Sequence, residues 1–309
     1  MPRIVSLVPA ATEIAAALGL LDSIVGVSHE CDFPVEVNNR PRVTSCPVHN
    51  VGLTSAEVDE WVRRALRDNG TIYTINEPLL RELQPEIILT QKLCDVCAVG
   101  YGTVARMAAM LPAPPQVVNL EPSSLTDIFE DIRRVAHVCG VANRGEALVG
   151  ALLDRVQAVQ NRALTASMRP RCFVMEWIDP VFCSGHWSPE LIEIAGGYDP
   201  LGRKHKPSAE IKWQAVLDAR PDVIVLALCG YNVARARQDY RLLSNFPGLY
   251  GLPAVQNRRV HIVDANAYFS RPGPRIVDTI EILAGILHPE IFPEFAQAAE
   301  AYPAVLLAN

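Results

Sequence analysis

The sequence lacks any apolar run of the ~20 residues that a membrane-spanning helix needs. It has no run of Lys and Arg that indicates nucleic-acid binding, and its formal net charge is −6, which argues against nucleic acid as the main partner. It begins without the basic segment, long apolar stretch and small-residue cleavage site of a secretory signal. With Met1 as the natural start, the sequence predicts a cytoplasmic protein; if a signal has been removed, it predicts a periplasmic one.

Motifs for catalysis are also absent. The chain contains no Gly-x-Ser-x-Gly, no phosphate-binding loop and no His-Glu-x-x-His, and Gly100-Tyr-Gly102 lacks the rest of a dinucleotide fingerprint. Glu176 and Asp179 form a candidate acid–base pair, but an Asp before a proline is more typical of a turn. The sequence therefore favours a binding protein over an enzyme.

A repeated unit indicates the fold class. Residues 79–90 and 215–226 each contain a helical turn, a proline (Pro85 and Pro221), an acidic residue and a branched apolar run. Proline ends a helix because it lacks the N–H that a helix interior needs. A short β-branched run suits a strand that is buried on both faces. Each copy therefore predicts the end of a helix leading into a buried parallel strand.

A second pair of similar segments supports a duplication. Residues 12–19 and 189–196 each open a helix after an apolar strand, with Thr12 as the predicted N-cap of the first. The spacing of the two pairs implies roughly forty extra residues in the first half. We predict two related α/β lobes with Rossmann-like parallel sheets; the alternative is one large α/β domain with coincidental similarity.

Residues 143–166 form the longest uninterrupted helical pattern, at the point where one lobe ends and the next begins. A helix of ~24 residues is about 36 Å long, enough to span a domain. The chain has 309 residues, about two domains on length. We predict an N-terminal α/β lobe over 1–142, a connecting helix over 143–168 and a C-terminal α/β lobe over 169–309.

Reactive and aromatic side chains gather just after the predicted strands. In an open parallel sheet, ligands bind beyond the carboxyl ends of the strands, so these side chains predict a shared ligand cleft. They are His29, Cys31, Asp32, Phe33, Cys46, His49, Cys94, Cys97, His186, Trp187, Cys229, Tyr231, Tyr268, Phe269 and Arg271. Cys139, Cys172 and Cys183 are predicted to be small buried hydrophobic residues instead.

The spacing Cys94-Asp-Val-Cys97 has three interpretations. Two thiolates at this spacing can hold zinc or another soft metal, with Cys31, Cys46 and His49 as further ligands if their loops converge. The same spacing between a strand and a helix is typical of a redox pair. The two cysteines can also simply line a pocket. For Cys31, Cys46, Cys94 and Cys97 we predict free thiols without a metal, all at the carboxyl edge of one parallel sheet.

Several longer motifs carry a family resemblance that covers nearly the whole chain. They include residues 4–13, Cys31-Asp-Phe-Pro34, residues 83–89, residues 94–98, residues 177–187 and residues 268–275. With these motifs the chain resembles the cobalamin-binding proteins among the periplasmic-binding-protein-like substrate-binding proteins of ABC transporters. That family also takes iron siderophores and haem.

The resemblance implies two lobes joined by one long helix, with a cobalamin-type corrinoid held between them without turnover. It places the loops at 31–34, 46–49, 186–187 and 268–271 on the ligand, with His49 or His186 approaching the cobalt. It implies a monomer that acts as carrier, sensor or transporter substrate-binding protein, with an ABC-transporter permease as partner in the last case. The alternatives are another metal-bearing ligand, such as haem, a siderophore or a thiolate-held metal ion, and a thiol-dependent redox or corrinoid-processing enzyme using Cys94 and Cys97.

Overall fold

The computed structural model confirms the predicted α/β fold class, with a sheet of parallel central strands in each of two compact units. It describes residues 1–46, 52–69, 71–91, 101–298 and 302–303. Unit 1 comprises Met1–Leu53, Glu57–Pro122 and Thr126–Ala151; unit 2 comprises Thr54–Ala56, Ser123–Leu125 and Leu152–Asn309. Each unit is described by itself below.

Unit 1 contains a four-stranded parallel sheet in the order β2-β1-β5-β6. Its strands are β1 (Ile4–Ser6), β2 (Ile24–Val27), β5 (Ile87–Gln91) and β6 (Gln116–Leu120), and a separate antiparallel pair is formed by β3 (Thr44–Ser45) and β4 (Thr74–Ile75). Its helices are α1 (Pro9–Ala17), α2 (Ser55–Asn69), α3 (Glu77–Leu83), α4 (Tyr101–Ala109) and α5 (Leu125–Val138), with 3-10 turns η1 (Leu21–Ser23) and η2 (Val35–Asn39).

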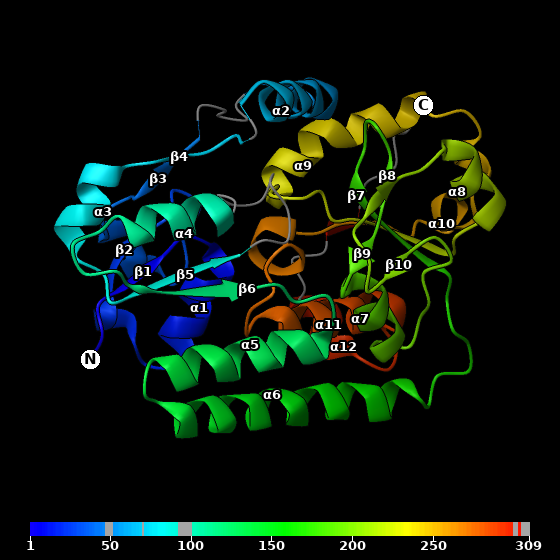
Figure 1. Cartoon of the computed structure of the whole chain (residues 1–309). Coiled ribbons are helices and arrows are strands. Elements are labelled where there is room, and N and C mark those ends of the chain that lie inside the picture. Colours follow the sequence, from blue (N-terminus) through cyan, green and yellow to red (C-terminus); the bar gives the residue numbers. More distant parts are fainter. Residues whose placement is uncertain (47–51, 70, 92–100, 299–301, 304–309) are drawn as a thin grey trace. The chain divides into compact units, whose positions relative to one another are not determined.

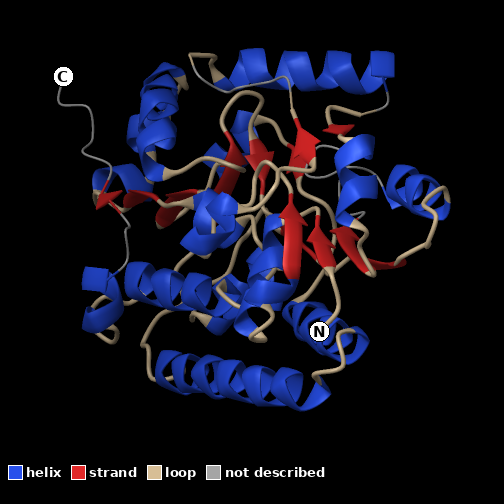
Figure 2. Cartoon of the chain, turned by 90° about the vertical axis from the view of Figure 1, so that its left-hand side faces the viewer, coloured by secondary structure: helices blue, strands red, loops and turns tan. Residues whose placement is uncertain are grey.

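Helices cover both faces of the unit 1 sheet. Figure 1 shows α4 on one side of β5 and β6 and α1 on the other, and Figure 2 shows blue helices on both sides of the red strands. All residues of β1 and β5 are buried, as expected for parallel strands with both faces covered. This arrangement leaves the carboxyl ends of the strands, where Ser28–Pro34 follows β2, as the natural position for a site.

The long helix α6 (Ala142–Ala163) begins in unit 1 and ends in unit 2, five residues before the end of the connecting helix predicted over 143–168. Its second half is fastened within unit 2 by Arg155, which donates to Glu281 at 2.7 Å and to Asp278 at 2.6 Å. The guanidinium therefore anchors the outgoing half of the helix to a carboxylate pair.

Unit 2 is built on a six-stranded sheet in the order β11-β8-β7-β12-β13-β14. Its strands are β7 (Cys172–Trp177), β8 (Phe182–Cys183), β11 (Ala209–Glu210), β12 (Val223–Leu226), β13 (Val260–Ile262) and β14 (Tyr302–Pro303). A separate parallel pair is formed by β9 (Gly185–His186) and β10 (Arg203–Lys204). Its helices are α7 (Ser188–Ile194), α8 (Trp213–Ala219), α9 (Val233–Tyr240), α10 (Pro253–Gln256), α11 (Ile276–Leu287) and α12 (Pro293–Ala298), with 3-10 turns η3 (Arg241–Asn245) and η4 (Leu249–Gly251) and a π-helical turn η5 (Ala265–Phe269).

Only the middle of the unit 2 sheet is parallel, which corrects the prediction of a wholly parallel lobe. Strands β7, β12 and β13 run parallel, whereas β8, β11 and β14 join the edges in antiparallel orientation. The two-residue strand β8 follows β7 after a short turn, and a hairpin connection of this kind allows only antiparallel pairing. Parallel strands need a longer crossover.

The repeated helix–proline–strand unit has the same backbone geometry in both copies. Helix α3 ends at Gln84 (φ 45°, ψ 59°) and helix α8 ends at Arg220 (φ 46°, ψ 60°), both in the left-handed region. In each copy the proline follows directly and the buried strand begins two residues after it. The sequence similarity therefore reflects a structural duplication.

The acidic residue that follows the proline accepts a backbone N–H in both copies. The Arg3 N–H donates to Glu86 Oε2 at 3.1 Å, and the Arg171 N–H donates to Asp222 Oδ2 at 2.9 Å. The Arg171 guanidinium also contacts Asp222, and its hydrogen bond keeps the pKa of that carboxyl below the usual value. The acid after the proline thus ties the start of one strand to the start of its neighbour.

The predicted cap at the first helix is wrong. Helix α1 begins at Pro9 with Val8 as N-cap, and Thr12 lies inside the helix with its hydroxyl donating to Ser6 Oγ at 2.8 Å. Proline favours the first helical position because its missing N–H has no helical partner there, so the helix starts earlier than predicted. Among the described helices, none is both long and apolar enough to cross a membrane.

Candidate functional site

In unit 1, His29 is the charged centre of the loop that follows β2. Its Nδ1 lies 2.8 Å from Thr44 Oγ1, its Nε2 lies 3.2 Å from Glu30 Oε1, and its ring centroid lies 5.4 Å from that of Tyr73, with the two rings tilted by 50°. Burial acts to lower the pKa of His29, but hydrogen bonds to Cys46 and Glu30 outweigh it and raise the pKa to about 9. The ring is therefore an imidazolium at neutral pH and has no lone pair to offer a metal.

Cys31 lies inside unit 1, although it was predicted to face a ligand. Its side chain is 1% exposed, and its Sγ lies 3.1 Å from both Thr12 Oγ1 and Ser28 Oγ. The neighbouring Asp32 and Phe33 are exposed, with Phe33 at 44%. The predicted loop therefore divides into a thiol that packs inward and an acid and an aromatic ring that remain accessible.

Cys46 comes after β3, which pairs with β4 in antiparallel orientation. Just before β3, Arg42 forms a parallel bridge with Val27 at the end of β2, so this segment also borders the parallel sheet. That the Cys46 loop lies at the carboxyl edge of this sheet stays a prediction. Cys46 is half-buried and a hydrogen-bond partner of His29, so it belongs to the His29 cluster.

In unit 2, His186 ends β9, which pairs in parallel with β10, and Trp187 follows as the N-cap residue of α7. The His186 N–H donates to the Lys206 carbonyl at 2.6 Å, and the backbone of His186 has φ 49°. Burial lowers the pKa of His186, so its imidazole is neutral at pH 7. A neutral imidazole is the form that coordinates a metal ion.

Trp187 and Phe269 pack together in the interior of unit 2. The Trp187 indole N–H donates to the Phe269 carbonyl at 3.1 Å, and the two side chains are 7% and 5% exposed. The His186 ring lies 5.5 Å from the Trp187 ring. The buried Trp187 ring therefore packs beside the His186 ring and exposes little surface to a ligand.

Tyr231 is also buried, at 1% exposure, although it was predicted to contact a ligand. The Arg235 guanidinium lies 4.3 Å above its ring and donates to its hydroxyl at 3.0 Å, and the Trp177 ring lies 5.1 Å away. Burial raises the pKa of the Tyr231 hydroxyl to about 12, so it stays protonated. Its carbonyl accepts the N–H groups of Ala265 and Asn266 at 3.1 Å, which fixes the start of η5.

The π-helical turn η5 carries Tyr268 and is followed by Arg271. Asp264 caps it by accepting the Ala267 N–H at 2.7 Å. Arg271 is 4% exposed and donates to Asn266 Oδ1 at 3.1 Å, whereas Tyr268 is only half-buried. Turns of this type are rare in proteins, but those that occur are often found at functional sites. Here the turn leaves Tyr268 partly accessible.

The side chains of Glu176 and Asp199, which the loop motifs did not indicate, accept hydrogen bonds from the residues just before His186. Glu176 Oε1 accepts the Gly185 N–H at 3.0 Å, and Asp199 accepts the Ser184 hydroxyl at 2.8 Å. Burial raises the pKa of Glu176 to about 7 and that of Asp199 to about 6. In the sequence, Glu176 was a candidate only as an acid paired with Asp179, and its hydrogen bond to a residue nine positions later had no sequence signal.

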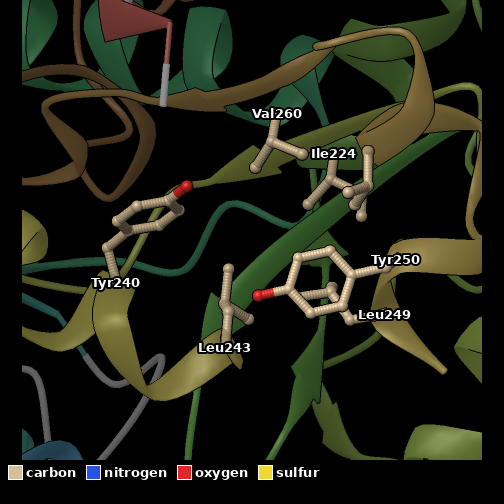
Figure 3. A pocket seen from close by; sticks show the side chains of 7 residues that line it. Ile224, Tyr240, Leu243, Leu249, Tyr250 and Val260 are labelled. Carbon is tan, nitrogen blue, oxygen red and sulfur yellow. The ribbon is translucent and has the colours of Figure 1, made fainter. Parts of the chain in front are cut away.

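One small hollow in unit 2 is not a ligand site. It is lined by side chains of β12, β13, α9, η3, η4 and α10, of which Tyr240 and Tyr250 are the largest (Figure 3). Its free volume is about 10 Å³, about the room that one water molecule needs. A corrin or porphyrin cannot enter it, so it is a packing gap beside the core.

Nothing in the described part of the chain forms a multidentate metal site. No group of three or more His, Cys, Asp or Glu side chains in that part is placed to hold a metal ion, so the zinc alternative gains no support. His49, Cys94 and Cys97 lie outside the described residues. Cys139, Cys172 and Cys183 are buried, which confirms the prediction for them, and Cys31 and Cys46 are free thiols.

Comparison with known proteins gives a family and relatives of nearly full length. The model of the periplasmic binding protein family matches residues 4–267. A vitamin B12-binding protein of Vibrio cholerae is 26% identical over 286 residues, which are 90% of this chain and 86% of the relative. An uncharacterized ABC transporter substrate-binding lipoprotein, YvrC of Bacillus subtilis, is 22% identical over 302 residues, which are 94% and 82% of the two chains. Among solved structures, a periplasmic haem-binding protein of Pseudomonas aeruginosa superposes with a TM-score of 0.70 at 17% identity, over 98% of this chain and 95% of that one.

Proposed function

The chain belongs to the periplasmic binding protein family, and from this membership we propose that it binds a cobalamin-type corrinoid and delivers it to the permease of an ABC transporter. Members of the family are non-catalytic, and so is this chain; the thiol-redox alternative has no support in the family. The proposed delivery to a permease also implies where the protein acts. We place binding on the outer side of the cytoplasmic membrane, the second of the two compartments that the sequence predicted.

The similarity to a vitamin B12-binding protein favours a corrinoid over the other ligands that proteins of this fold bind. The likeness to the haem-binding protein supports the shared fold and does not discriminate between tetrapyrroles. The described residues suit an amide-rimmed macrocycle, since accessible aromatic rings (Phe33 and Tyr268) can pack on its faces and polar groups such as Asp32 can meet its rim. These contacts, and the position of the ligand between the lobes, stay predictions.

His186 is the single observation that carries the proposal. It combines a neutral imidazole, a partly exposed ring and a backbone fixed by hydrogen bonds, which are the properties of a preorganised axial ligand for cobalt. The buried positions of Trp187, Phe269, Tyr231 and Arg271 make them supports of this site, and direct contact with the ligand is proposed only for the accessible side chains. His29 is an unsuitable ligand because it is charged at neutral pH.

Calorimetric titration of the purified protein with cyanocobalamin, haemin and a ferric siderophore tests the proposed ligand. We expect the corrinoid to bind with a Kd of micromolar or lower, equivalent to about −8 kcal/mol or better, and the other two to bind much more weakly. Preferred binding of haemin or of the siderophore contradicts the proposal. Albumin titrated in parallel controls for unspecific binding of the apolar macrocycles.

Substituting His186→Ala tests the cobalt ligand. Aquocobalamin has an exchangeable water on cobalt, so the wild-type protein is expected to shift its absorption bands as imidazole replaces water, and the variant is expected to leave them unshifted. The affinity for aquocobalamin should fall about tenfold, because the variant loses one polar contact to a charged centre. Methylcobalamin offers no exchangeable water and serves as the control ligand. Bands that do not shift with the wild-type protein contradict the role of His186.

A further inference from the structure

A run of four basic side chains lies beside His186. Residues Arg203-Lys-His-Lys206 form the longest uninterrupted run of Arg, Lys and His in a chain with a net charge of −6. Lys204 and Lys206 are two of only four lysines in the whole sequence. Such a concentration in an acidic protein marks a local positive field that attracts anions.

Backbone hydrogen bonds hold this run against His186. The two strands β9 and β10 pair in parallel, with Gly185 opposite Arg203 and His186 opposite Lys204. The His186 N–H donates to the Lys206 carbonyl at 2.6 Å, and the His205 N–H donates to the His186 carbonyl at 2.8 Å. The backbone of the basic run and that of the proposed cobalt ligand are therefore joined in one hydrogen-bonded unit.

Half of the basic run is already paired inside the protein. Lys204 Nζ lies 2.5 Å from Glu193 Oε2, and His205 Nε2 lies 3.4 Å from Glu190 Oε2. Both carboxylates belong to α7, so these two contacts fasten β10 and His205 to the helix that follows His186, and the His205 contact is an ion pair only when the imidazole is protonated. Their role is structural, and they leave the other two side chains of the run available.

Arg203 and Lys206 are exposed, and neither has a carboxylate within ion-pair distance in the part of the chain that the structure describes. Surface cations in acidic proteins are usually matched by neighbouring acids, and α7 supplies acids only to the other two members of the run. The backbone of the run is held by the strand pair and by the contacts of Lys204 and His205 with α7. Among the described residues Arg203 and Lys206 have no acidic partner, so their charges are available to an anionic ligand.

We propose that Arg203 and Lys206 bind the phosphodiester in the nucleotide loop of the corrinoid. This inference rests on the proposed function, because a corrin with amide side chains has this phosphodiester as its one anionic group. A guanidinium can bind two phosphate oxygens at once, and an ammonium adds a point charge. The site gives the protein a means to select complete corrinoids over precursors that lack the nucleotide loop.

Titration with two corrinoids that differ in this loop tests the inference. Cyanocobalamin contains the phosphodiester, and dicyanocobinamide lacks the nucleotide loop and its phosphate. For the variant Arg203→Ala/Lys206→Ala we expect the affinity for cyanocobalamin to fall about tenfold or more, whereas the affinity for dicyanocobinamide changes less than about twofold. The wild-type affinity for cyanocobalamin should also fall more steeply with added salt than that for dicyanocobinamide.

The control variant Lys212→Ala/Arg241→Ala removes one lysine and one arginine that are likewise exposed in unit 2, so it changes the net charge equally. It is expected to bind both corrinoids like the wild type. Equal weakening of both corrinoids by Arg203→Ala/Lys206→Ala, or no weakening of either, overturns the phosphate site while the proposed function stands. If the wild-type protein binds neither corrinoid, the proposed function itself falls and takes the inference with it.

Discussion

An alanine at position 185 is expected to disrupt the β9–β10 pair and to abolish binding at His186. A Cβ on Gly185 would lie 2.2 Å from the Ser208 nitrogen, 2.7 Å from the Lys206 carbonyl oxygen and 2.7 Å from the Pro207 carbonyl carbon. All three atoms belong to the backbone, so no side-chain rotation relieves the overlap. The two chain segments must separate, which breaks the hydrogen bond from His186 to Lys206. We expect a loss of about 3 kcal/mol of unfolding free energy, at the upper end for overpacked sites.

Chemical denaturation of Gly185→Ala, together with corrinoid titration, measures both effects. Gly150→Ala is the matched control, because Gly150 lies inside α6 and a Cβ there meets no atom within 4 Å. Alanine favours a helix interior over glycine by about 1 kcal/mol, so the control should be slightly more stable than the wild type and bind normally. A Gly185→Ala variant with wild-type stability and affinity would show that residues 206–208 can move away freely, and the rigid strand pair would have to be abandoned.

The secondary structure near the repeats was predictable because it depends on local rules. Pro85 and Pro221 end helices at the expected points, and the apolar runs after them are the buried strands β5 and β12. The connecting helix was found for the same reason, since its apolar spacing extends over 22 residues. Such signals need no knowledge of the tertiary structure.

The burial of the candidate site residues was not predictable, because it depends on contacts between distant segments. Trp187 is covered by η5, whose Phe269 lies 82 positions later, and nothing near Trp187 in the sequence indicates this. Thr12 and Cys31 likewise meet across 19 positions, which turns a predicted helix cap and a predicted ligand contact into a buried pair. The sequence identified loops that carry reactive residues; it could not tell which of their side chains face outward.

The second large effect is expected from Glu176→Gln and depends on pH. Glu176 accepts the Gly185 N–H, and the neighbours that affect its charge are the Ser188 and Ser208 hydroxyls and Asp199. Burial raises the pKa of Glu176 from 4.5 to about 7, so the folded protein holds this proton more tightly than the unfolded chain does. The stability that Glu176 contributes is thus fully present below pH 4.5 and is lost as the pH rises through about 7.

Glutamine keeps the acceptor oxygen for Gly185 and never ionises, so the variant should escape that loss. Relative to the wild type, its unfolding free energy should improve by up to about 3 kcal/mol between pH 4 and pH 8, since each unit of pKa shift is worth about 1.4 kcal/mol. Denaturant titrations at several pH values measure this difference, in which the contributions of titrating groups that do not interact with Glu176 cancel. Glu36→Gln, at an exposed position in η2, is the control and should show no such trend. Parallel stability curves for Glu176→Gln and the wild type would mean that water reaches the carboxyl, and that the strand pair under His186 is more open than its hydrogen bonds indicate.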